Sequence, residues 1–219
     1  MSARLLAIDS PHCPGPEPVD ARGHGEFNLI GVARSLSRDE ELYGQSDKAD
    51  FVYKVVSGAM REVRLLADGR RQLTNFFLPG DVFGIELEAE HAAGTAAICR
   101  TVVISARRSN LNQDYDQATQ LWRHAMGQLQ RSHTHLLTLG RRSAAERIAI
   151  FLIDLAKRMG ATEQLCLPMS RQDIGDYLGL TIETVSRTLT RMQAKGLLAL
   201  DGSRKVRLLK RAALAEFCD

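Results

Sequence analysis

The sequence has no long apolar run. No stretch approaches the roughly 18 consecutive apolar residues of a membrane-spanning helix. The N-terminal segment, which includes Asp9, His12 and Pro14, lacks the apolar centre of a secretion signal. Both absences predict a cytoplasmic protein without a membrane partner.

Cysteine is scarce, and neither cysteine nor histidine is spaced as in a metal site. The four cysteines lie far apart and never at C-x-x-C spacing: Cys13, Cys99, Cys166 and Cys218. This excludes a disulfide-stapled scaffold and a zinc finger. His133 and His135 are two apart on a predicted helix, where their side chains diverge. We therefore expect no bound metal, and we expect surface positions for the histidines: His12, His24, His91, His124, His133 and His135.

Catalytic motifs are missing as well. The sequence contains no G-x-S-x-G, no Walker A loop and no H-E-x-x-H. Glu86, Glu88 and Glu90 alternate along a polar stretch that is expected to face solvent. The protein is therefore not expected to be an enzyme.

The composition is that of a folded protein, but its charge is unevenly distributed. Hydrophobic residues make up 44% and charged residues 25% of the 219 residues, which allows one large domain or two modules. Residues 1–140 carry 15 Lys and Arg against 17 Asp and Glu, a net of −2. Residues 141–219 carry 14 against 9, a net of +5, which suits a polyanionic partner.

The first half of the chain predicts a tail followed by a β domain. Residues 1–25 are rich in proline and glycine and are predicted to be a flexible tail. Residues 26–108 contain short β-prone runs, at 51–56, 60–66 and 72–78, and Asp68-Gly69 between two of them indicates a hairpin. A later run, 95–105, predicts one further strand. The regular spacing of the runs is typical of a compact roll.

A long helix is predicted next, over residues 109–140. From Asn110 to Leu139 the apolar residues follow alternating steps of four and three, and Asn110 can cap the start. About 30 residues at about 1.5 Å each give a helix near 45 Å, too long for one small roll to cover. The helix either packs along its own domain or, as we favour, pairs with a second copy in a parallel coiled coil. The predicted dimer interface is Leu111, Tyr115, Ala118, Trp122, Ala125, Leu129 and Leu136.

Residues 141–219 predict a winged helix-turn-helix. Ser170 and Thr181 can each cap a helix, over 170–178 and 181–195, with Gly179-Leu180 between them. A short helix, a tight glycine turn and a second helix is the spacing of a helix-turn-helix. Two β-prone runs, 197–200 and 205–209, then form a hairpin typical of a wing.

The outer face of the second helix carries side chains that can read DNA bases. Arg187 can donate two hydrogen bonds to guanine, Glu183 can accept one from cytosine, and Ile182 can touch a thymine methyl. Alternatively, Glu183 and Arg187 form only an i,i+4 surface ion pair. The caps, the turn, the wing and the charge together favour DNA reading. We predict base contacts from Ile182, Glu183, Ser186 and Arg187, and backbone contacts from Ser170, Arg171, Gln172, Thr181, Thr184, Arg191 and Lys205.

These segments resemble a known superfamily. The segment SRQDIGDYLGLTIETVSR at 170–187 is similar to the helix-turn-helix of the superfamily of the cyclic-AMP receptor protein and the fumarate and nitrate reduction regulator. YKVVSG at 53–58 and LPGDVFG at 78–84 resemble its β-roll signatures. The resemblance covers residues 27–217. It implies an α+β fold with an N-terminal β roll of the cyclic-nucleotide-binding jelly-roll type, a long dimerisation helix and a C-terminal winged helix-turn-helix.

Within the superfamily, Glu183-x-x-Ser186-Arg187 matches the fumarate and nitrate regulator branch, and the chain looks like the FixK-type activators. The resemblance implies a homodimer on an inverted repeat such as TTGAT-N4-ATCAA. It places Arg187 at guanine, Glu183 at the facing cytosine or the neighbouring adenine, and Ser186 at a thymine. It also implies that the protein contacts RNA polymerase and activates genes for low-oxygen respiration and nitrogen fixation.

Departures from the superfamily argue against its usual cofactors. Cyclic-AMP binders place an arginine at the phosphate, where this chain has Gly94-Thr95-Ala96, and burying a phosphate without that charge costs about several kcal/mol. Iron-sulfur sensors use clustered N-terminal cysteines, whereas the tail here has Cys13 alone. We therefore expect no cofactor.

Two regulated alternatives stay open. The roll can be gated by a small ligand that the sequence does not identify. Cys166 can act as a redox switch, because its thiol lies a few residues before a basic DNA-contacting helix. Its simpler interpretation is a small apolar residue in a β stretch.

Overall fold

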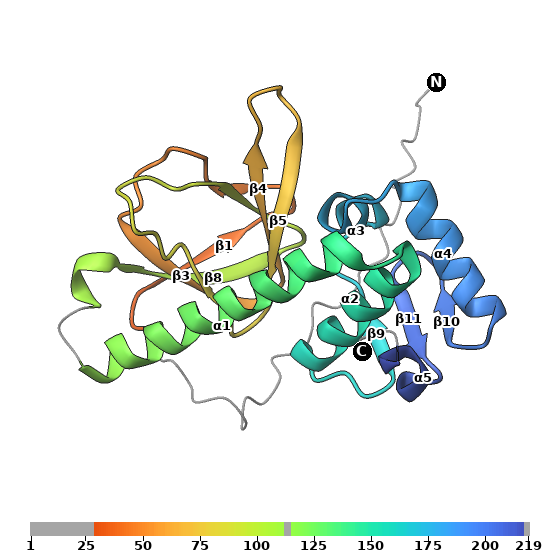
Figure 1. The fold of residues 1–219 in the computed structure, drawn as a ribbon. Coiled ribbons are helices and arrows are strands. Elements are labelled where there is room, and N and C mark those ends of the chain that lie inside the picture. The colour runs from red at the N-terminus through yellow and green to blue at the C-terminus, as the bar shows by residue number, and fades with distance from the viewer. Residues whose placement is uncertain (1–28, 112–114, 217–219) are drawn as a thin grey trace, which may run out of the picture.

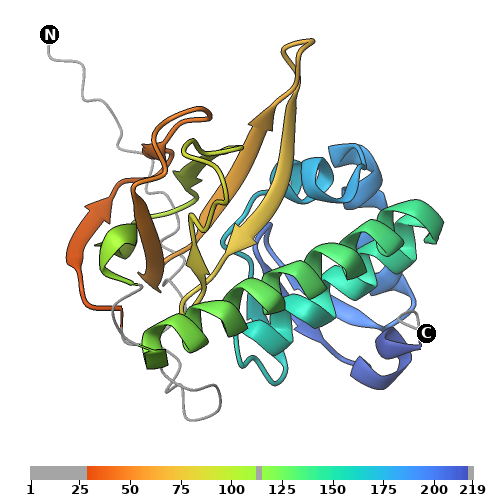
Figure 2. The same cartoon turned by 60° about the vertical axis from the view of Figure 1, so that its left-hand side comes forward.

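The structure is a computed structural model that describes residues 29–111 and 115–216. Figure 1 shows a β roll on one side, a helical unit with a small sheet on the other, and a long helix running past both. The turned view in Figure 2 places the long helix against both parts again. The chain is therefore α+β, as predicted, and the predicted tail lies outside the described residues.

The roll consists of two four-stranded antiparallel sheets. In the first sheet the order is β1-β8-β3-β6, with β1 at Val32–Leu36, β3 at Phe51–Ser57, β6 at Val82–Phe83 and β8 at Thr101–Arg107. In the second the order is β2-β7-β4-β5, with β2 at Glu41–Tyr43, β4 at Met60–Leu65, β5 at Arg71–Phe77 and β7 at Gly94–Ala97. Their facing side chains form an aromatic-rich core around Tyr43, Tyr53, Phe77 and Phe83.

The predicted hairpin is confirmed, but the predicted strand over 95–105 is wrong. Gly69 turns between β4 and β5 with a φ of 81°, in the left-handed region that glycine tolerates. The later run is divided into β7 and β8 because Ile98 leaves the ladder and packs against the C-terminal helices. Thr101 Oγ1 accepts a hydrogen bond from the Ala59 N–H at 3.1 Å and holds the chain at this bend.

The long helix is present and begins later than predicted. A short 3-10 helix, η1 at Arg108–Asn110, precedes α1, which spans Tyr115–Arg141. Asn110 therefore ends the 3-10 helix and does not cap α1. Leu111 is 3% exposed and packs with Leu29 and Val82 inside the roll. Because the roll already covers it, Leu111 is corrected from a dimer contact to a core residue.

The C-terminal unit contains four helices and a three-stranded sheet within the described residues. They are α2 at Ala144–Arg158, β9 at Gln164–Cys166, α3 at Arg171–Leu178, α4 at Ile182–Ala194, β10 at Leu198–Asp201, β11 at Lys205–Leu208 and α5 at Arg211–Ala215. β11 pairs with both β10 and β9, so the predicted wing hairpin gains a third strand. None of the helices in the described residues combines the length and apolarity that a membrane crossing requires.

The roll and the C-terminal unit share one apolar cluster. Phe76 of β5 packs on Phe151 of α2 and on Tyr177 of α3, with ring centroids 6.1 and 5.1 Å apart. Ala59, Leu73 and Ile98 of the roll belong to the same cluster as the α2 core. This continuity fixes how the helix-turn-helix sits relative to the roll, because interiors pack densely and resist sliding.

Arg158 of α2 reinforces this junction with charge. Its Nη2 donates to Asp81 Oδ2 at 2.6 Å and to the Phe76 carbonyl oxygen at 2.7 Å. Burial alone would lower the pKa of Arg158, but the carboxylates of Asp81 and Asp154 outweigh burial and raise that pKa. Arg158 therefore stays charged and links α2 to the roll.

A second arginine links the roll to the helix-turn-helix. Arg61 of β4 donates to Asp173 Oδ1 at 3.2 Å and to Asp39 Oδ1 at 2.8 Å. Asp173 also accepts from the Ser170 N–H at 3.0 Å, so the carboxylate that caps α3 is the one that the roll holds.

Replacing Arg158 tests the junction. Arg158→Met is expected to lower the free energy of unfolding by about 3 kcal/mol, because Asp81 stays mostly buried and keeps only the longer ion pair with Arg131, at 3.7 Å. Urea unfolding measures the loss. The control is Arg70→Met, whose ion pair with Asp68 is exposed and should contribute less than about 1 kcal/mol. Equal losses for both variants would contradict this interpretation.

Candidate nucleic-acid interface

The first helix of the helix-turn-helix, α3, begins and ends as the sequence predicts. Ser170 accepts from the Asp173 N–H and Asp173 accepts from the Ser170 N–H, which completes a capping box. Gly179 ends the helix in the left-handed conformation, at a φ of 63°. The apolar face, with Ile174 and Leu178, is buried. A Cβ added to Gly175 would lie 2.7 Å from the Leu180 carbonyl oxygen, so the turn approaches α3 too closely for a larger residue.

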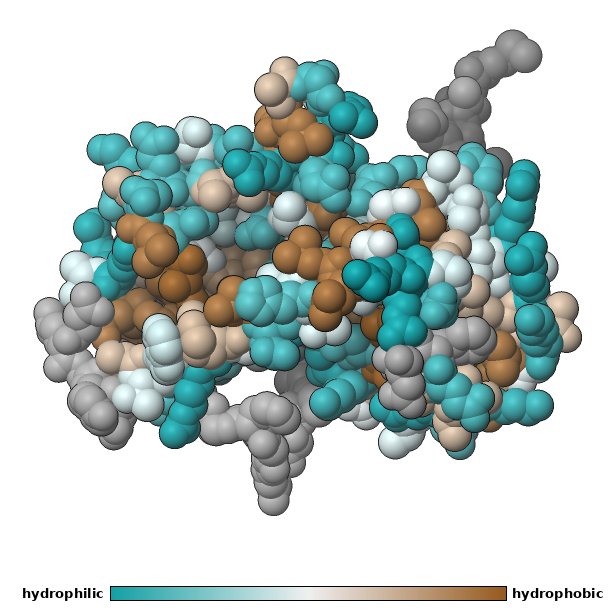
Figure 3. Space-filling model, in the orientation of Figure 1, coloured by the Kyte–Doolittle hydropathy of each residue, from teal (hydrophilic) through white to brown (hydrophobic). Residues whose placement is uncertain are grey.

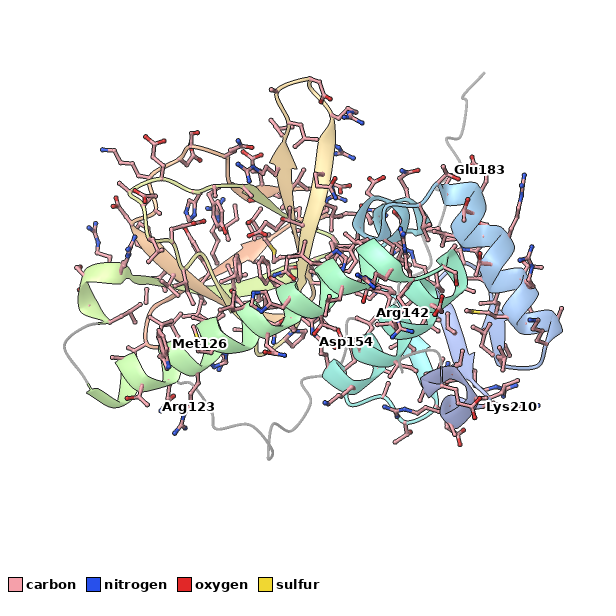
Figure 4. All side chains as sticks on the ribbon, in the orientation of Figure 1. Arg123, Met126, Arg142, Asp154, Glu183 and Lys210 are labelled. Atoms are coloured by element: carbon pink, nitrogen blue, oxygen red, sulfur yellow. The ribbon has the colours of Figure 1, made fainter. Side chains whose placement is uncertain are left out.

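The second helix, α4, buries one face and exposes the other. Thr181 caps it by accepting from the Thr184 N–H, and Val185, Leu189 and Met192 are buried below. The predicted base-reading residues all lie on the remaining surface: Ile182, Glu183 and Arg187 are exposed and Ser186 is half-buried. Figure 4 shows Glu183 at the outer end of α4. The structure thus brings these four side chains together on one helix face.

The local electrostatics keep Glu183 ionised. Its own backbone N–H at the start of α4, the Thr181 hydroxyl and the Arg187 charge all hold the pKa of this carboxyl below its ordinary value. Among the described residues, Glu183 and Arg187 form no ion pair, so the surface-pair alternative is not what the structure contains. A carboxylate and a guanidinium on neighbouring turns remain available to bases.

The predicted backbone-contacting residues surround this face. Arg191 is exposed one turn after Arg187, and Lys205 lies on β11, 3.7 Å from Asp201. Four more are engaged within the helix-turn-helix: Ser170 and Thr181 in the caps, Thr184 with Thr181 at 3.2 Å, and Gln172 with Asp176 at 2.6 Å. Arg171 donates to Ser186 Oγ at 3.2 Å.

The apolar face of α1 follows a different line from the predicted one. Trp122, Leu129 and Leu136 are exposed, as a dimer interface requires, whereas Ala118 and Ala125 are half-buried. The side chain of Tyr115 lies outside the described residues. The sequence analysis missed Met126 and Leu137, which are 37% and 69% exposed. Figure 3 shows apolar surface along the front of the molecule where α1 runs, and Figure 4 labels Met126 on that helix.

The roll interior also differs from the prediction. His91 is 2% exposed and stacks on Tyr43, with ring centroids 3.6 Å apart, so it is not a surface histidine. Its Nδ1 lies 3.5 Å from Glu86 Oε1, which turns Glu86 inward, while Glu88 and Glu90 are exposed. His91 is buried because it stacks on an aromatic ring that is distant in the sequence, and the spacing of histidines along the chain could not predict this contact.

His135 was also predicted to lie at the surface, and its side chain is half-buried instead. Its ring stacks on Tyr177 of α3, with centroids 4.0 Å apart. Burial lowers the pKa of His135 below its ordinary value. The imidazole is therefore neutral near pH 7 and packs as an aromatic ring between α1 and α3.

Cys166 lies in β9 between two buried leucines, as its simpler interpretation predicts. It is disulfide-bonded in this structure, which is the oxidised form of a cysteine pair, so the redox switch at Cys166 stays a prediction. Cys99, half-buried at the bend between β7 and β8, is the free cysteine among the described residues.

A β roll joined by a long helix to a winged helix-turn-helix defines a DNA-binding transcription regulator. Residues 33–117 match the cyclic nucleotide-binding domain, and residues 146–217 match the Crp-like helix-turn-helix domain. The chain belongs to the CRP/FNR family of transcription regulators, which confirms the predicted fold and the prediction that it is not an enzyme.

Several relatives carry the name FixK. The chain is 45% identical to the nitrogen fixation regulation protein FixK of Rhizobium meliloti (strain 1021), over 93% of this chain and 96% of the relative. It is 43% identical to FixK of Azorhizobium caulinodans, over 84% and 78%. The structure of FixK2 from Bradyrhizobium japonicum matches with a TM-score of 0.82 and 44% identity, over 86% and 98%.

Because of the close contact at Gly175, replacing this glycine by alanine is expected to destabilise the protein, the opposite of the usual effect in a helix. Alanine normally stabilises a helix interior by about 1 kcal/mol over glycine, but Gly175→Ala must push the Leu180 carbonyl aside and displace α4. We expect a lower melting temperature and weaker DNA binding. Gly127→Ala on α1, where the nearest atom is 3.6 Å away, is the control and should be neutral or stabilising. If Gly175→Ala proved as stable as Gly127→Ala, the turn at Leu180 would be able to move without cost, and the expectation would be wrong.

Proposed function

We propose that this chain is a homodimeric transcription activator that binds an inverted repeat such as TTGAT-N4-ATCAA and works with RNA polymerase in the cytoplasm. The names of the FixK relatives support nitrogen fixation genes as its targets. Genes for low-oxygen respiration are proposed beside them from the resemblance of the helix-turn-helix to that of the FixK-type activators. The observation that carries the proposal is the exposed face of α4, where Glu183 and Arg187 stand unpaired with each other beside Ile182 and Ser186. These groups match the donor and acceptor pattern of the major groove.

Homodimerisation is supported by the exposed apolar residues of α1. Trp122, Met126, Leu129, Leu136 and Leu137 leave large apolar side chains in water along one helix. A second copy that pairs its α1 with this one would bury them, because such a stripe is the seam of a coiled coil. Two-fold symmetry would then place two α4 helices about 34 Å apart, one turn of DNA.

The residues around Thr95 support binding without a cyclic nucleotide. Gly94 stands where cyclic-AMP binders carry the arginine that neutralises the phosphate. Glu62 of β4 pairs with Thr95, and burial raises the pKa of the Glu62 carboxyl, with the Glu86 charge adding to the shift. These carboxyl groups offer a buried phosphate no positive charge. We therefore propose that the roll is a scaffold rather than a nucleotide site.

The cysteine arrangement supports binding without an iron-sulfur cluster. A cubane cluster takes about four thiolates, whereas the described residues contain the disulfide-bonded Cys166 and the free Cys99. No group of three His, Cys, Asp or Glu side chains within residues 29–111 and 115–216 is placed to hold a metal ion.

A cavity at the junction favours the second candidate, an effector-gated regulator. It measures about 140 Å³ and lies between β5, α1, α2 and α3. Its walls include Arg131, Arg147, Ile150 and Tyr177. A small ligand here would touch both α1 and α3 and could bias the placement of α4. Dialysis separates the two candidates: the cofactor-free activator keeps its DNA affinity, and a gated regulator loses it until a metabolite is restored.

DNA binding tests the proposal directly. In a mobility shift, dialysed protein should bind a TTGAT-N4-ATCAA duplex more tightly than a scrambled duplex. Arg187→Ala and Glu183→Ala should each cost about 1–3 kcal/mol on the operator only, because each removes a base contact. Lys205→Ala is the matched control and should weaken both duplexes alike and reduce the salt dependence. Wild-type binding that does not prefer the operator would defeat the proposal.

The dimer has a test of its own. Leu136→Glu places a charge in the apolar stripe of α1 and should convert the dimer to monomer in sedimentation velocity, with operator binding lost by at least about tenfold. Leu65→Glu, on the β4 strand away from α1 and 56% exposed, is the control and should leave the dimer intact. A wild-type chain that sediments as a monomer would contradict this part.

A further inference from the structure

The contact between the two helices of the helix-turn-helix includes one polar bond on the DNA-facing side. Arg171, the first residue of α3, donates from Nη1 to Ser186 Oγ on α4 at 3.2 Å. Both side chains are half-buried, and the Nε of Arg171 is buried without a hydrogen-bond partner among the described residues. The guanidinium is thus drawn in against α4 at some cost rather than extended into solvent.

The chemistry of this pair fixes the role that Ser186 can play. A guanidinium has only donors, so the serine oxygen must act as the acceptor. One lone pair of Ser186 Oγ is then occupied, and this charge-assisted bond makes the Ser186 O–H a stronger donor and the remaining lone pair a weaker acceptor. Ser186 stands one residue before Arg187 on the exposed side of α4.

We propose that Arg171 is a positioning residue that makes the Ser186 hydroxyl a hydrogen-bond donor toward DNA, and thereby sets a preference for thymine over cytosine. In the major groove thymine presents the O4 acceptor where cytosine presents an amino donor. A serine hydroxyl biased toward donating bonds thymine O4 well, whereas at cytosine only its weakened lone pair is left to accept from the amino group. This inference rests on the proposed function, because it assumes that α4 lies in the major groove.

The alternative role for Arg171, a phosphate contact, predicts different behaviour. A phosphate contact carries no sequence information, so its loss weakens all duplexes equally and lowers the salt slope by about one. We expect this phosphate-contact behaviour of Arg191, which is exposed on α4. Arg191 therefore serves as the arginine control for Arg171, which is half-buried on α3 and bonded to Ser186.

The experiment measures operator affinity for the full-length chain and its variants on a set of duplexes. The variants are Arg171→Met, Ser186→Ala, the double variant and Arg191→Met. The duplexes are TTGAT-N4-ATCAA, the same operator with each thymine of the half-sites replaced symmetrically by cytosine, and a scrambled sequence. Thermal melts verify folding, and Arg171→Gln replaces Arg171→Met if the latter does not fold.

We expect wild-type protein to discriminate by about 3- to 10-fold per half-site against cytosine at one thymine position, the range of one hydrogen bond. Arg171→Met and Ser186→Ala should each abolish that discrimination, and the double variant should lose no more than either alone. Arg191→Met should keep it while binding every duplex more weakly.

Two results overturn the inference, and they are distinguishable. If Arg171→Met weakens operator and scrambled duplexes equally and keeps the discrimination, Arg171 contacts phosphate and the proposed function stands. If wild-type protein binds the operator no more tightly than the scrambled duplex, the proposed function fails and the inference fails with it.

Discussion

The burial of one face of α4 is the constraint on which the rest depends. Val185, Leu189 and Met192 leave water together, and they can do so only if α4 lies flat on the core that α2 and α3 form. A helix has two faces, so fixing the apolar one fixes the polar one. Glu183 and Arg187 lie on the outward face for this reason, and the start of α4 and the Thr181 hydroxyl then stabilise the Glu183 carboxylate there.

The roll takes part in this arrangement through the junction. One apolar cluster runs from the roll into α2 and α3, and Asp173 connects the two parts chemically. The same carboxylate caps α3 and accepts from Arg61 of β4. Any shift of the roll against the helix-turn-helix would leave a mostly buried carboxylate without part of its bonding, which is costly. The roll and the helix-turn-helix are therefore held in one relative placement.

The interior of the roll contains buried polar side chains that belong to neither the junction nor the helix-turn-helix. His91 lies flat on Tyr43 and beside Glu86. Burial raises the pKa of Tyr43 above its ordinary value, so its hydroxyl stays protonated. Aromatic rings and carboxyl groups occupy this region, which suits a packed core better than an anion site.

Local signals in the sequence predicted the hairpin at Gly69, the capping side chains of α3 and α4, the turn at Gly179 and the presence of a long helix before the C-terminal unit. These depend on neighbours a few residues away, and propensity and spacing therefore predicted which residues α4 leaves on its outer face. Only the tertiary structure decided that Leu111 belongs to the roll, that Met126 joins the exposed stripe, and that His91 is buried. Each of those outcomes depends on which distant surface covers the residue, and spacing along the chain holds no record of that surface.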